Sequence, residues 1–394
     1  MRAVLPPENE PVTTTRLFEP FRLRGVTLKN RILASPMCMY RAEHDGKAND
    51  WHFAHYSRLA MGGAAMVMLE ATAVDILGRH CYADLGIWGD EHVAPLKRIA
   101  DFMKSQQCVP ALQLQHAGRK GGTRRPWHGK SPLNDEDIRL RGEPPWPVFG
   151  PSALPASDGM PMPSELAGAD VSKIIEQWVM AARRALMAGF EVLELHAAHG
   201  YLVHQFLSEF SNKRTDRYGG DLAGRMRFAL ELVEAVRRVW PQDKPLLVRV
   251  SAVDEAGWSL DDTVALAREL KARGVDAIDC SSGGIAGSPT NQAARGPGFQ
   301  VPYAERVRAD AGIATIAVGL IMTPQLAAEI IDRGCADLVA IGREVLVNPN
   351  WPCAARTLLE PDRGHADWPP ETGWWLDRRA DILAAAGIGV RQPA

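Results

Sequence analysis

The chain has 394 residues, of which 46% are hydrophobic, and a formal net charge of −2 that gives no electrostatic reason to bind nucleic acid or an anionic membrane. Its six cysteines are scattered without a Cys-x-x-Cys pair, which argues against a zinc site, an iron–sulfur cluster and a disulfide framework. No apolar stretch approaches the roughly 20 residues that span a bilayer, and the amino terminus lacks a signal-peptide core, so we expect a cytoplasmic protein.

Residues 1–16 are rich in proline and acidic side chains, and we expect them to form a disordered extension. Residues 17–28 predict a short hairpin around Gly25. Beyond it, short apolar runs alternate with stretches of helical spacing, the pattern of parallel strands buried on both faces. The predicted strands are residues 30–37, 64–70, 109–115, 190–196, 246–251, 275–280, 313–318 and 337–341. The predicted helices are residues 54–61, 91–105, 170–188, 223–239, 260–273, 301–309, 324–332 and 352–359.

Eight strands that alternate with helices predict the α/β class, and within it a single (β/α)8 TIM barrel over residues 17–380 with the hairpin as an N-terminal cap. Residues 121–169 break the alternation after the third strand with a long run rich in proline, glycine and charge. Such irregular segments inside a compact domain are usually functional, so we expect an insertion over the mouth of the barrel. Asp170 is predicted to cap the next helix, and residues 381–394 to form a C-terminal tail.

In barrels of this kind the chemistry lies at the carboxyl ends of the strands. The fourth predicted strand ends in His196, His199 and Tyr201. Three interpretations stay open here. The histidines are structural, or they ligate zinc with His116 or His204 as a third ligand, or they form an oxyanion-type pair that grips a carbonyl oxygen. In the third case Tyr201 fits as a proton donor, because a phenol is protonated at neutral pH.

Glycines follow the last three predicted strands. Gly283-Gly284 comes after the sixth, Gly319 after the seventh and Gly342-Arg343 after the eighth. Tight turns would explain each glycine separately. Three consecutive strand ends with glycine favour a phosphate cradle, in which the backbone approaches the anion closely and Arg343 forks onto its oxygens.

Two polar side chains, Gln113 and Arg249, lie inside predicted strands. A buried guanidinium needs an acceptor, so Arg249 pairs with a strand carboxylate such as Glu194 or meets a ligand. Gln113 is a hydrogen-bonded core amide or part of the same site. Together the two side chains suit the pyrimidine edge of an isoalloxazine ring, where Arg249 would hold negative charge as the ring is reduced.

The segment Ser35-Pro36-Met37-Cys38 ends the first predicted strand, because proline removes a ladder donor. A phenol follows at Tyr40. A free cysteine is most often a small buried hydrophobe, so Cys38 alone does not indicate a site.

Together, in this order and at predicted strand ends, these motifs resemble the old yellow enzyme family of FMN-dependent ene reductases. The resemblance covers residues 17–380. More specifically, the chain resembles the bacterial subgroup with a cysteine after the first strand, called thermophilic-like or xenobiotic-reductase-like. The motifs that carry it are Ser35-Pro36-Met37-Cys38, Glu70-Ala71-Thr72-Ala73, Gln113 with His116-Ala117-Gly118-Arg119-Lys120, His196-x-x-His199-Gly200-Tyr201, residues 211–220, Val248-Arg249-Val250-Ser251 and Gly342-Arg343.

The resemblance implies non-covalent FMN, NAD(P)H as the source of hydride, and ping-pong reduction of alkenes activated by a carbonyl or nitro group. It implies that His196 and His199 bind the activating oxygen, that Tyr201 protonates Cα after hydride reaches Cβ, and that Tyr40 lines the pocket. Cys38 is implied to lie by the flavin and tune its potential. The implied FMN contacts are Ser35, Pro36, Met37, Cys38, Ala71, Gln113, Arg249, Gly283, Gly284, Gly319, Gly342 and Arg343.

The resemblance also implies a homo-oligomer, a dimer or a tetramer, in which a C-terminal residue reaches the site of a neighbouring subunit. The candidates are Trp374, Trp375, Arg378 and Arg379. We place Trp375 in the substrate site, and we expect small activated alkenes and NAD(P)H as partners. Two other classes stay open: a non-redox phosphate-binding barrel, which has no need of Gln113 with Arg249, and a zinc hydrolase that uses His196 and His199.

Overall fold

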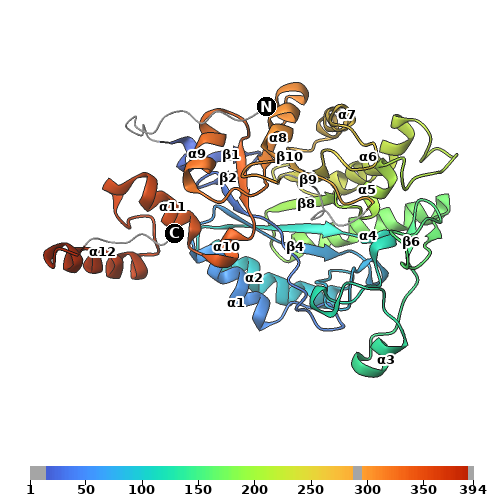
Figure 1. Cartoon of the computed structure of the whole chain (residues 1–394), viewed down its shortest axis with the longest axis horizontal. Helices are drawn as coiled ribbons and strands as arrows, with labels where there is room; N and C mark the ends of the chain where they lie inside the picture. The colour runs from blue at the N-terminus through green and yellow to red at the C-terminus, as the bar shows by residue number, and fades with distance from the viewer. Residues whose placement is uncertain (1–14, 287–294, 389–394) are drawn as a thin grey trace.

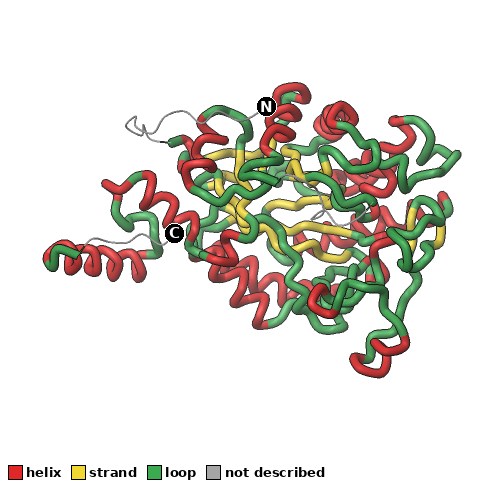
Figure 2. Tube along the Cα trace, in the orientation of Figure 1, coloured by secondary structure: helices red, strands yellow, loops and turns green. Residues whose placement is uncertain are grey.

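The computed structural model describes residues 15–286 and 295–388, and its centre is a closed barrel of parallel strands (Figures 1 and 2). Around the barrel the strands follow the order β10, β11, β12, β3, β4, β5, β8 and β9. Helices surround the strands on the outside, so the α/β class and the (β/α)8 barrel are confirmed.

The barrel strands are β3 (Ile32–Ala34), β4 (Met66–Ala73), β5 (Val109–Gln115), β8 (Val192–Ala197), β9 (Leu246–Ser251), β10 (Ala277–Ser281), β11 (Ala314–Ala317) and β12 (Leu338–Ile341). The longer helices are α1 (Asp50–Met61), α2 (Val93–Ser105), α4 (Gly168–Met187), α6 (Leu222–Val239), α7 (Leu260–Ala272), α8 (Val301–Ala311), α9 (Pro324–Asp332), α11 (Trp351–Leu359) and α12 (Pro370–Ala385). The short elements are η1 (Arg16–Phe18), β1 (Phe21–Leu23), β2 (Val26–Leu28), η2 (Ile76–Gly78), η3 (Asp90–His92), η4 (Gly118–Lys120), η5 (Pro126–His128), α3 (Asp135–Arg141), β6 (Phe149–Gly150), β7 (Ser164–Glu165), α5 (Leu202–Leu207), α10 (Glu344–Val347) and η6 (Pro361–Arg363).

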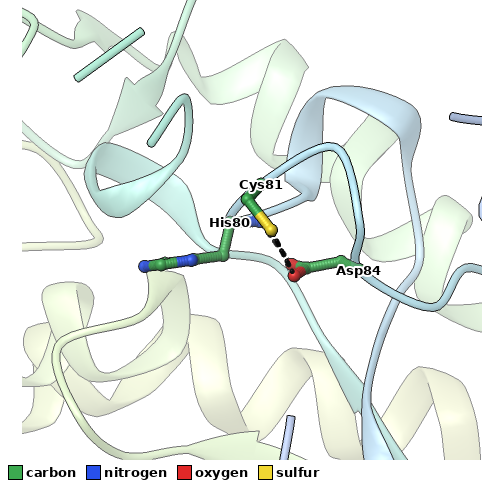
Figure 3. Close-up of side chains that lie close together, drawn as sticks. All are labelled: His80, Cys81 and Asp84. Atoms are coloured by element: carbon green, nitrogen blue, oxygen red, sulfur yellow. Dashed lines mark hydrogen bonds between the residues drawn. The ribbon is translucent and has the colours of Figure 1, made fainter. Parts of the chain in front are cut away.

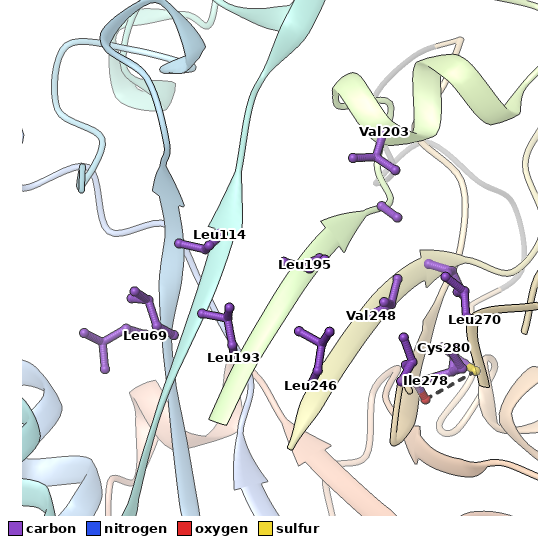
Figure 4. Close-up of a cluster of buried hydrophobic side chains, with 14 of the residues drawn as sticks. Leu69, Leu114, Leu193, Leu195, Val203, Leu246, Val248, Leu270, Ile278 and Cys280 are labelled. Carbon is purple, nitrogen blue, oxygen red and sulfur yellow. Dashed lines mark hydrogen bonds between the residues drawn. The ribbon is translucent and has the colours of Figure 1, made fainter. Parts of the chain in front are cut away.

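The strands are mostly apolar because both of their faces are covered. Every residue of β4, β8, β9, β10 and β12 is buried. Leu69, Leu114, Leu193 and Leu195 belong to the large hydrophobic cluster that the strands share with the surrounding helices (Figure 4). Full burial of one such leucine stabilises the fold by about 1.5–3 kcal/mol, so this layer fixes the barrel wall.

A second, smaller cluster fills the amino end of the barrel. The antiparallel hairpin β1–β2 contributes Leu23 and Leu28. They pack with Leu33, Met66 and Leu338 from the barrel strands β3, β4 and β12. The hairpin therefore closes this end of the barrel, and polar side chains are left to the carboxyl ends of the strands.

Two helices begin earlier than the sequence predicts. α1 begins at Asp50 instead of residue 54, because the Asn49 side chain caps it in a reciprocal capping box. α4 begins at Gly168 with Ala167 at the N-cap, so Asp170 lies in the first turn instead of capping the helix. There its carboxylate still interacts favourably with the positive end of the helix dipole.

The segment between β5 and α4 is less irregular than predicted, because it contains α3 and the parallel pair β6–β7. An Asn134 cap and three acidic residues in its first turn favour α3. β6 packs against η4 and α5, two elements that directly follow β5 and β8. This part of the insertion therefore lies at the carboxyl end of the barrel.

The chain ends depart from the predicted boundaries. Of the predicted extension, residues 1–14 lie outside the described residues, whereas Thr15 caps η1 and Arg16 donates its backbone N–H to Asp332. The predicted boundary at residue 380 falls inside α12, which projects from the barrel beside α11 (Figure 1). None of the described helices combines the length and the apolar character needed to cross a membrane.

Candidate active site

The carboxyl end of β8 brings three predicted site residues together. His196 lies in β8, and His199 and Tyr201 lie in the turn that follows, where His199 (φ 57°) and Gly200 (φ 74°) adopt the left-handed conformation. The ring centroid of His196 lies 5.1 Å from that of His199 and 5.0 Å from that of Tyr201. His196 at the end of the strand therefore contacts both the His199 imidazole and the Tyr201 phenol of the turn.

Three neighbouring strand ends fix the position of His199. Its backbone N–H donates to Ser251 Oγ (3.0 Å), its carbonyl accepts from Lys120 Nζ (2.9 Å), and its Nε2 lies 2.8 Å from Ser281 Oγ. A Cβ added to Gly284 would lie 2.8 Å from the His199 Cα, so only glycine fits against this turn. The loops after β5, β9 and β10 thus hold the turn in its left-handed conformation.

Both histidines are neutral near pH 7. Burial, reinforced for each ring by nearby positive charge that includes Arg249, lowers the pKa of His196 and of His199 well below the ordinary value. His199 Nδ1 lies 3.4 Å from His196 Nε2. His196 Nδ1 is buried and has no hydrogen-bond partner in the described part of the chain. Burial also raises the pKa of Tyr201, which keeps its phenol protonated.

The third ligands that a zinc site would need are engaged elsewhere. His116 Nδ1 accepts the backbone N–H of Gly118 (3.0 Å), and His204 Nδ1 accepts that of Gly200 (2.9 Å). His204 Nε2 lies 3.4 Å from a carboxylate oxygen of Asp254. One nitrogen of each imidazole is therefore engaged by a backbone donor, and the Nε2 of His204 faces a buried carboxylate.

Within residues 15–286 and 295–388, the one group of three possible metal ligands is His80, Cys81 and Asp84, whose ligand atoms lie within 4.8 Å of one another. The Cys81 thiol donates to Asp84 (3.4 Å), and the His80 ring points away from this pair (Figure 3). Asp84 is further engaged by the backbone N–H of His80 (2.6 Å). The cluster is therefore a hydrogen-bonded turn with an outward imidazole.

The His80 imidazole, which points away from Cys81 and Asp84, lies beside two predicted site residues, and the sequence did not indicate it. The ring centroid of His80 lies 6.1 Å from that of Tyr40 and 6.2 Å from that of Tyr201. Trp127, from the insertion, lies 6.0 Å from Tyr40. Neither residue stands in a strand or a recognised motif, so no local pattern indicates them. His80 and Trp127 thus both lie beside Tyr40, the residue that the sequence predicts to line the pocket together with Cys38.

The predicted flavin-binding side chains inside the barrel pair with carboxylates on adjacent strands. Gln113 Nε2 donates to Glu194 (2.7 Å), and Arg249 Nε lies 3.5 Å from Asp279. Arg249 also donates to Ser35 Oγ (3.3 Å). Arg249 therefore pairs with a strand carboxylate, as one of the sequence alternatives predicts, and that carboxylate is Asp279 instead of the example Glu194.

This polar layer is incompletely satisfied. Arg249 Nε, Glu194 Oε2 and Asp279 Oδ1 are buried without a hydrogen-bond partner among the residues that the structure describes. Buried polar atoms are normally paired, so a polar ligand is expected against them. Because Gln113 uses its Nε2 on Glu194, its carbonyl oxygen is the atom that suits an N–H group of a ring. The layer fits the polar edge of a flavin.

The predicted phosphate-binding residues lie at the same end of the barrel. At Gly342 the nearest atom to an added Cβ is Met37 Sδ at 4.0 Å, so the backbone there borders open space. Arg343 is exposed at the start of α10. Gly319 has a φ of 112°, and an added Cβ would lie 2.8 Å from Gln300 Oε1. An open glycine beside a guanidinium fits a phosphate.

Trp375, which the sequence predicts for the substrate site, does not lie near the other predicted site residues within a single chain. It lies on α12, where 69% of its side chain is exposed. A cavity of about 620 Å³ near this helix, lined among others by Asn30, Gly63 and Trp368, borders the amino ends of the strands. The histidines and Tyr201 at the carboxyl end of β8 thus lie at the opposite end of the barrel from this cavity.

The fold and the site together define a flavin-binding barrel oxidoreductase. The chain belongs to the NADH:flavin oxidoreductase / NADH oxidase family, whose model matches residues 16–361. It is an FMN-dependent NAD(P)H oxidoreductase of the ene reductase kind, and the resemblance to old yellow enzymes is confirmed. The matched residues end before α12.

Its relatives support this placement. The NADPH dehydrogenase of Geobacillus sp. (strain WCH70) is 44% identical over 348 residues, which are 88% of this chain and 95% of that protein. Morphinone reductase superposes with a TM-score of 0.72 at 27% identity, over 87% of this chain and 90% of its own. An old yellow enzyme homologue from Zymomonas mobilis superposes with a TM-score of 0.72 at 24% identity, over 88% of this chain and 92% of its own, which supports the fold.

Proposed function

We propose that the chain reduces the C=C bond of alkenes activated by a carbonyl or nitro group, with NAD(P)H as the hydride source in a ping-pong order. The observation that carries the proposal is the buried Nδ1 of His196, which has no hydrogen-bond partner among residues 15–286 and 295–388, beside the Tyr201 phenol. A lone donor and a proton source at a barrel mouth are what reduction of a polarised alkene needs. Bound FMN would supply the hydride chemistry.

The residues that would hold FMN lie on, or shortly after, seven of the barrel strands. Gln113 and Arg249 face its pyrimidine edge, and Arg249 favours negative charge there. Arg343 and the glycines of the rim hold its phosphate. The full proposed set is Ser35, Pro36, Met37, Cys38, Ala71, Gln113, Arg249, Gly283, Gly284, Gly319, Gly342 and Arg343.

A chain of hydrogen bonds gives the two histidines different parts in holding the activating oxygen. Gln300 Nε2 lies 3.4 Å from Ser281 Oγ and 2.7 Å from Ser282 Oγ, and we assign the Ser281 hydroxyl as the donor to His199 Nε2. His199 then carries its proton on Nδ1 and donates to His196 Nε2. The proton of His196 consequently lies on Nδ1, the atom without a partner. His196 is therefore the primary donor to the oxygen, and His199 supports it.

Tyr201 is placed to deliver the proton that completes the reaction at Cα. Its pKa is raised by burial, so the phenol is protonated over the physiological range. Cys38 borders the same space, and Tyr40 and His80 form its wall. Because burial lowers the pKa of His80 to about 4, its imidazole is neutral, and the Thr123 hydroxyl lies 3.3 Å from its ring nitrogens.

The arrangement of α12 supports a homo-oligomer. The helix exposes Trp374, Trp375 and Ile382. Trp374 and Trp375 pack against each other with centroids 4.7 Å apart. We propose that a second copy covers this arm, and that Trp375 reaches the neighbouring site. The six cysteines are free thiols, which suits a reducing compartment such as the cytoplasm.

The test begins with the purified protein. A yellow preparation with a flavin absorption band, which releases FMN on denaturation, supports the cofactor. NADPH oxidation that starts only on addition of 2-cyclohexenone, with cyclohexanone as product, supports ene reduction. A colourless protein that contains zinc, or NADPH oxidation without formation of cyclohexanone under anaerobic conditions, would contradict the proposal.

A further inference from the structure

Glu70 is a buried carboxyl to which neither the family comparison nor the proposed reaction assigns a part. It lies in β4, where the register with β5 shifts between Leu69 and Thr72, so Glu70 has no direct partner in the ladder. Only 1% of its surface is exposed. An irregularity of this kind re-aims the side chains of the strand and is frequent next to active sites.

The Glu70 side chain connects α1 to the segment that leaves β3. Its Oε2 accepts the backbone N–H of Met39 (2.8 Å), and its Oε1 accepts the hydroxyl of Tyr56 in α1 (3.0 Å). The Tyr56 oxygen in turn accepts the backbone N–H of Glu70 (3.1 Å), and His52 Nε2 lies 3.7 Å from Oε1. Tyr56 and His52 are both buried, so the carboxyl is held from two sides.

The segment that Glu70 contacts has reason to need support. Residues 35–49 contain no helix or strand. Tyr40 has a φ of 54°, a left-handed conformation that is unfavourable for a residue with a Cβ by roughly 1–2 kcal/mol. The hydrogen bond from Met39, the residue before it, offsets this strain. Cys38 and Tyr40 stand on either side of that bonded N–H group.

We propose that Glu70 is a positioning residue whose carboxyl holds the backbone of residues 38–40, so that the Cys38 thiol and the Tyr40 phenol keep their places in the site. The importance of those places for catalysis rests on the proposed function, whereas the holding contact does not. Burial raises the pKa of Glu70 to about 8, so the group is mostly uncharged at pH 7. Glutamine, with a carbonyl oxygen in the same place, is therefore a close replacement.

The experiment compares Glu70→Ala, Glu70→Gln and a control in FMN-loaded enzyme. The control is Asp276→Ala, which removes a carboxyl that accepts the backbone N–H of Leu246 (2.8 Å) at the opposite end of the barrel. The first readout is the rate at which iodoacetamide alkylates Cys38, followed by mass spectrometry of the tryptic peptide. The second is the flavin midpoint potential.

Glu70→Ala is expected to speed alkylation of Cys38 by about tenfold, the factor that one lost buried hydrogen bond carries. It should move the potential in the same direction as Cys38→Ala does. Glu70→Gln should stay within about threefold of the parent, and Asp276→Ala should lower the melting temperature without changing the alkylation rate.

An unchanged rate in Glu70→Ala would overturn the proposal, and so would an equal increase in Asp276→Ala, which would indicate general loosening. An increase in Glu70→Gln as large as in Glu70→Ala would also overturn it, because charge and not the contact would then be responsible. If Cys38→Ala itself leaves the potential unchanged, the site assignment of Cys38 fails, and the alkylation rates still decide the role of Glu70.

Discussion

Replacing His196 by alanine removes the proposed substrate donor, which has no partner in the part of the chain that the structure describes, and we expect reduction of an enone to slow by about 10²–10³-fold. Hydride attack on Cβ moves negative charge onto the carbonyl oxygen, so a donor aimed at that oxygen acts mainly in the transition state. One donor of this type typically contributes ~2.7–4 kcal/mol. At about 1.36 kcal/mol for each factor of ten, this energy gives the expected range.

The structure predicts a smaller loss for His199→Ala. The Nε2 of His199 lies 2.8 Å from Ser281 Oγ and its Nδ1 faces His196, so its removal deletes a support and leaves the donor in place. We expect about a tenfold effect, the value of one net hydrogen bond. Ser281→Ala lies one step further along the chain and should slow the reaction less than His199→Ala.

Stopped-flow measurement of the two half-reactions checks the order of these effects. Flavin reduction by NADPH should stay within about threefold of the parent in His196→Ala, because no oxyanion develops in that half-reaction. Oxidation by 2-cyclohexenone should carry nearly the whole loss. Equal slowing of both half-reactions, or a larger loss in His199→Ala than in His196→Ala, would refute the assignment of His196 as the primary donor.

Three further outcomes are expected. Arg343→Ala should weaken FMN binding by about 1–3 kcal/mol through loss of a charge-assisted contact, and unchanged affinity in a fluorescence titration would remove the phosphate assignment. Cys38→Ala should keep the fold and the flavin but shift the midpoint potential, whereas an unshifted potential with an unaltered substrate profile would make Cys38 a core residue. Tyr201→Phe should leave enone binding intact and slow the proton-dependent step by about 10²-fold or more; a small loss would mean that solvent delivers the proton.

The barrel could be predicted because its strands are buried on both faces and therefore read as apolar runs between helices. The predicted ends at 109–115 and 246–251 match β5 and β9. The errors have local causes. A reciprocal capping box at Asn49 starts α1 early, and the irregularity at Glu70 lets β4 continue to Ala73 where the sequence predicts an end.

In the candidate site, too, some residues could be predicted from the sequence and others could not. Residues at strand ends, such as His196 and Gly342, could be placed because parallel strands align their carboxyl ends. His80 and Trp127 could not, since neither lies in a strand or a recognised motif and each reaches Tyr40 only through long-range packing. Which imidazole nitrogen faces the substrate also depends on Ser281, a neighbour that no local pattern connects to the histidines.

Strand register decides the electrostatics beneath the flavin site, and a sequence pattern carries no register between strands. In the barrel Gln113 stands directly opposite Glu194, and Arg249 directly opposite Asp279, so each polar side chain meets its neighbour across the ladder. Burial, aided by Asp279, raises the pKa of Glu194 to about 8, so this carboxyl is mostly protonated at neutral pH.

The protonation of Glu194 matters for the charge that Arg249 can offer a ligand. With Glu194 neutral, Arg249 and Asp279 compensate each other, and the guanidinium can turn toward an added negative charge without a net anionic background. With both carboxyls ionised the layer would carry a net negative charge and oppose such a ligand. A proton on Glu194 removes one negative charge from this layer, which favours the proposed role of Arg249 as a cationic side chain beside a ligand while it also pairs with Asp279.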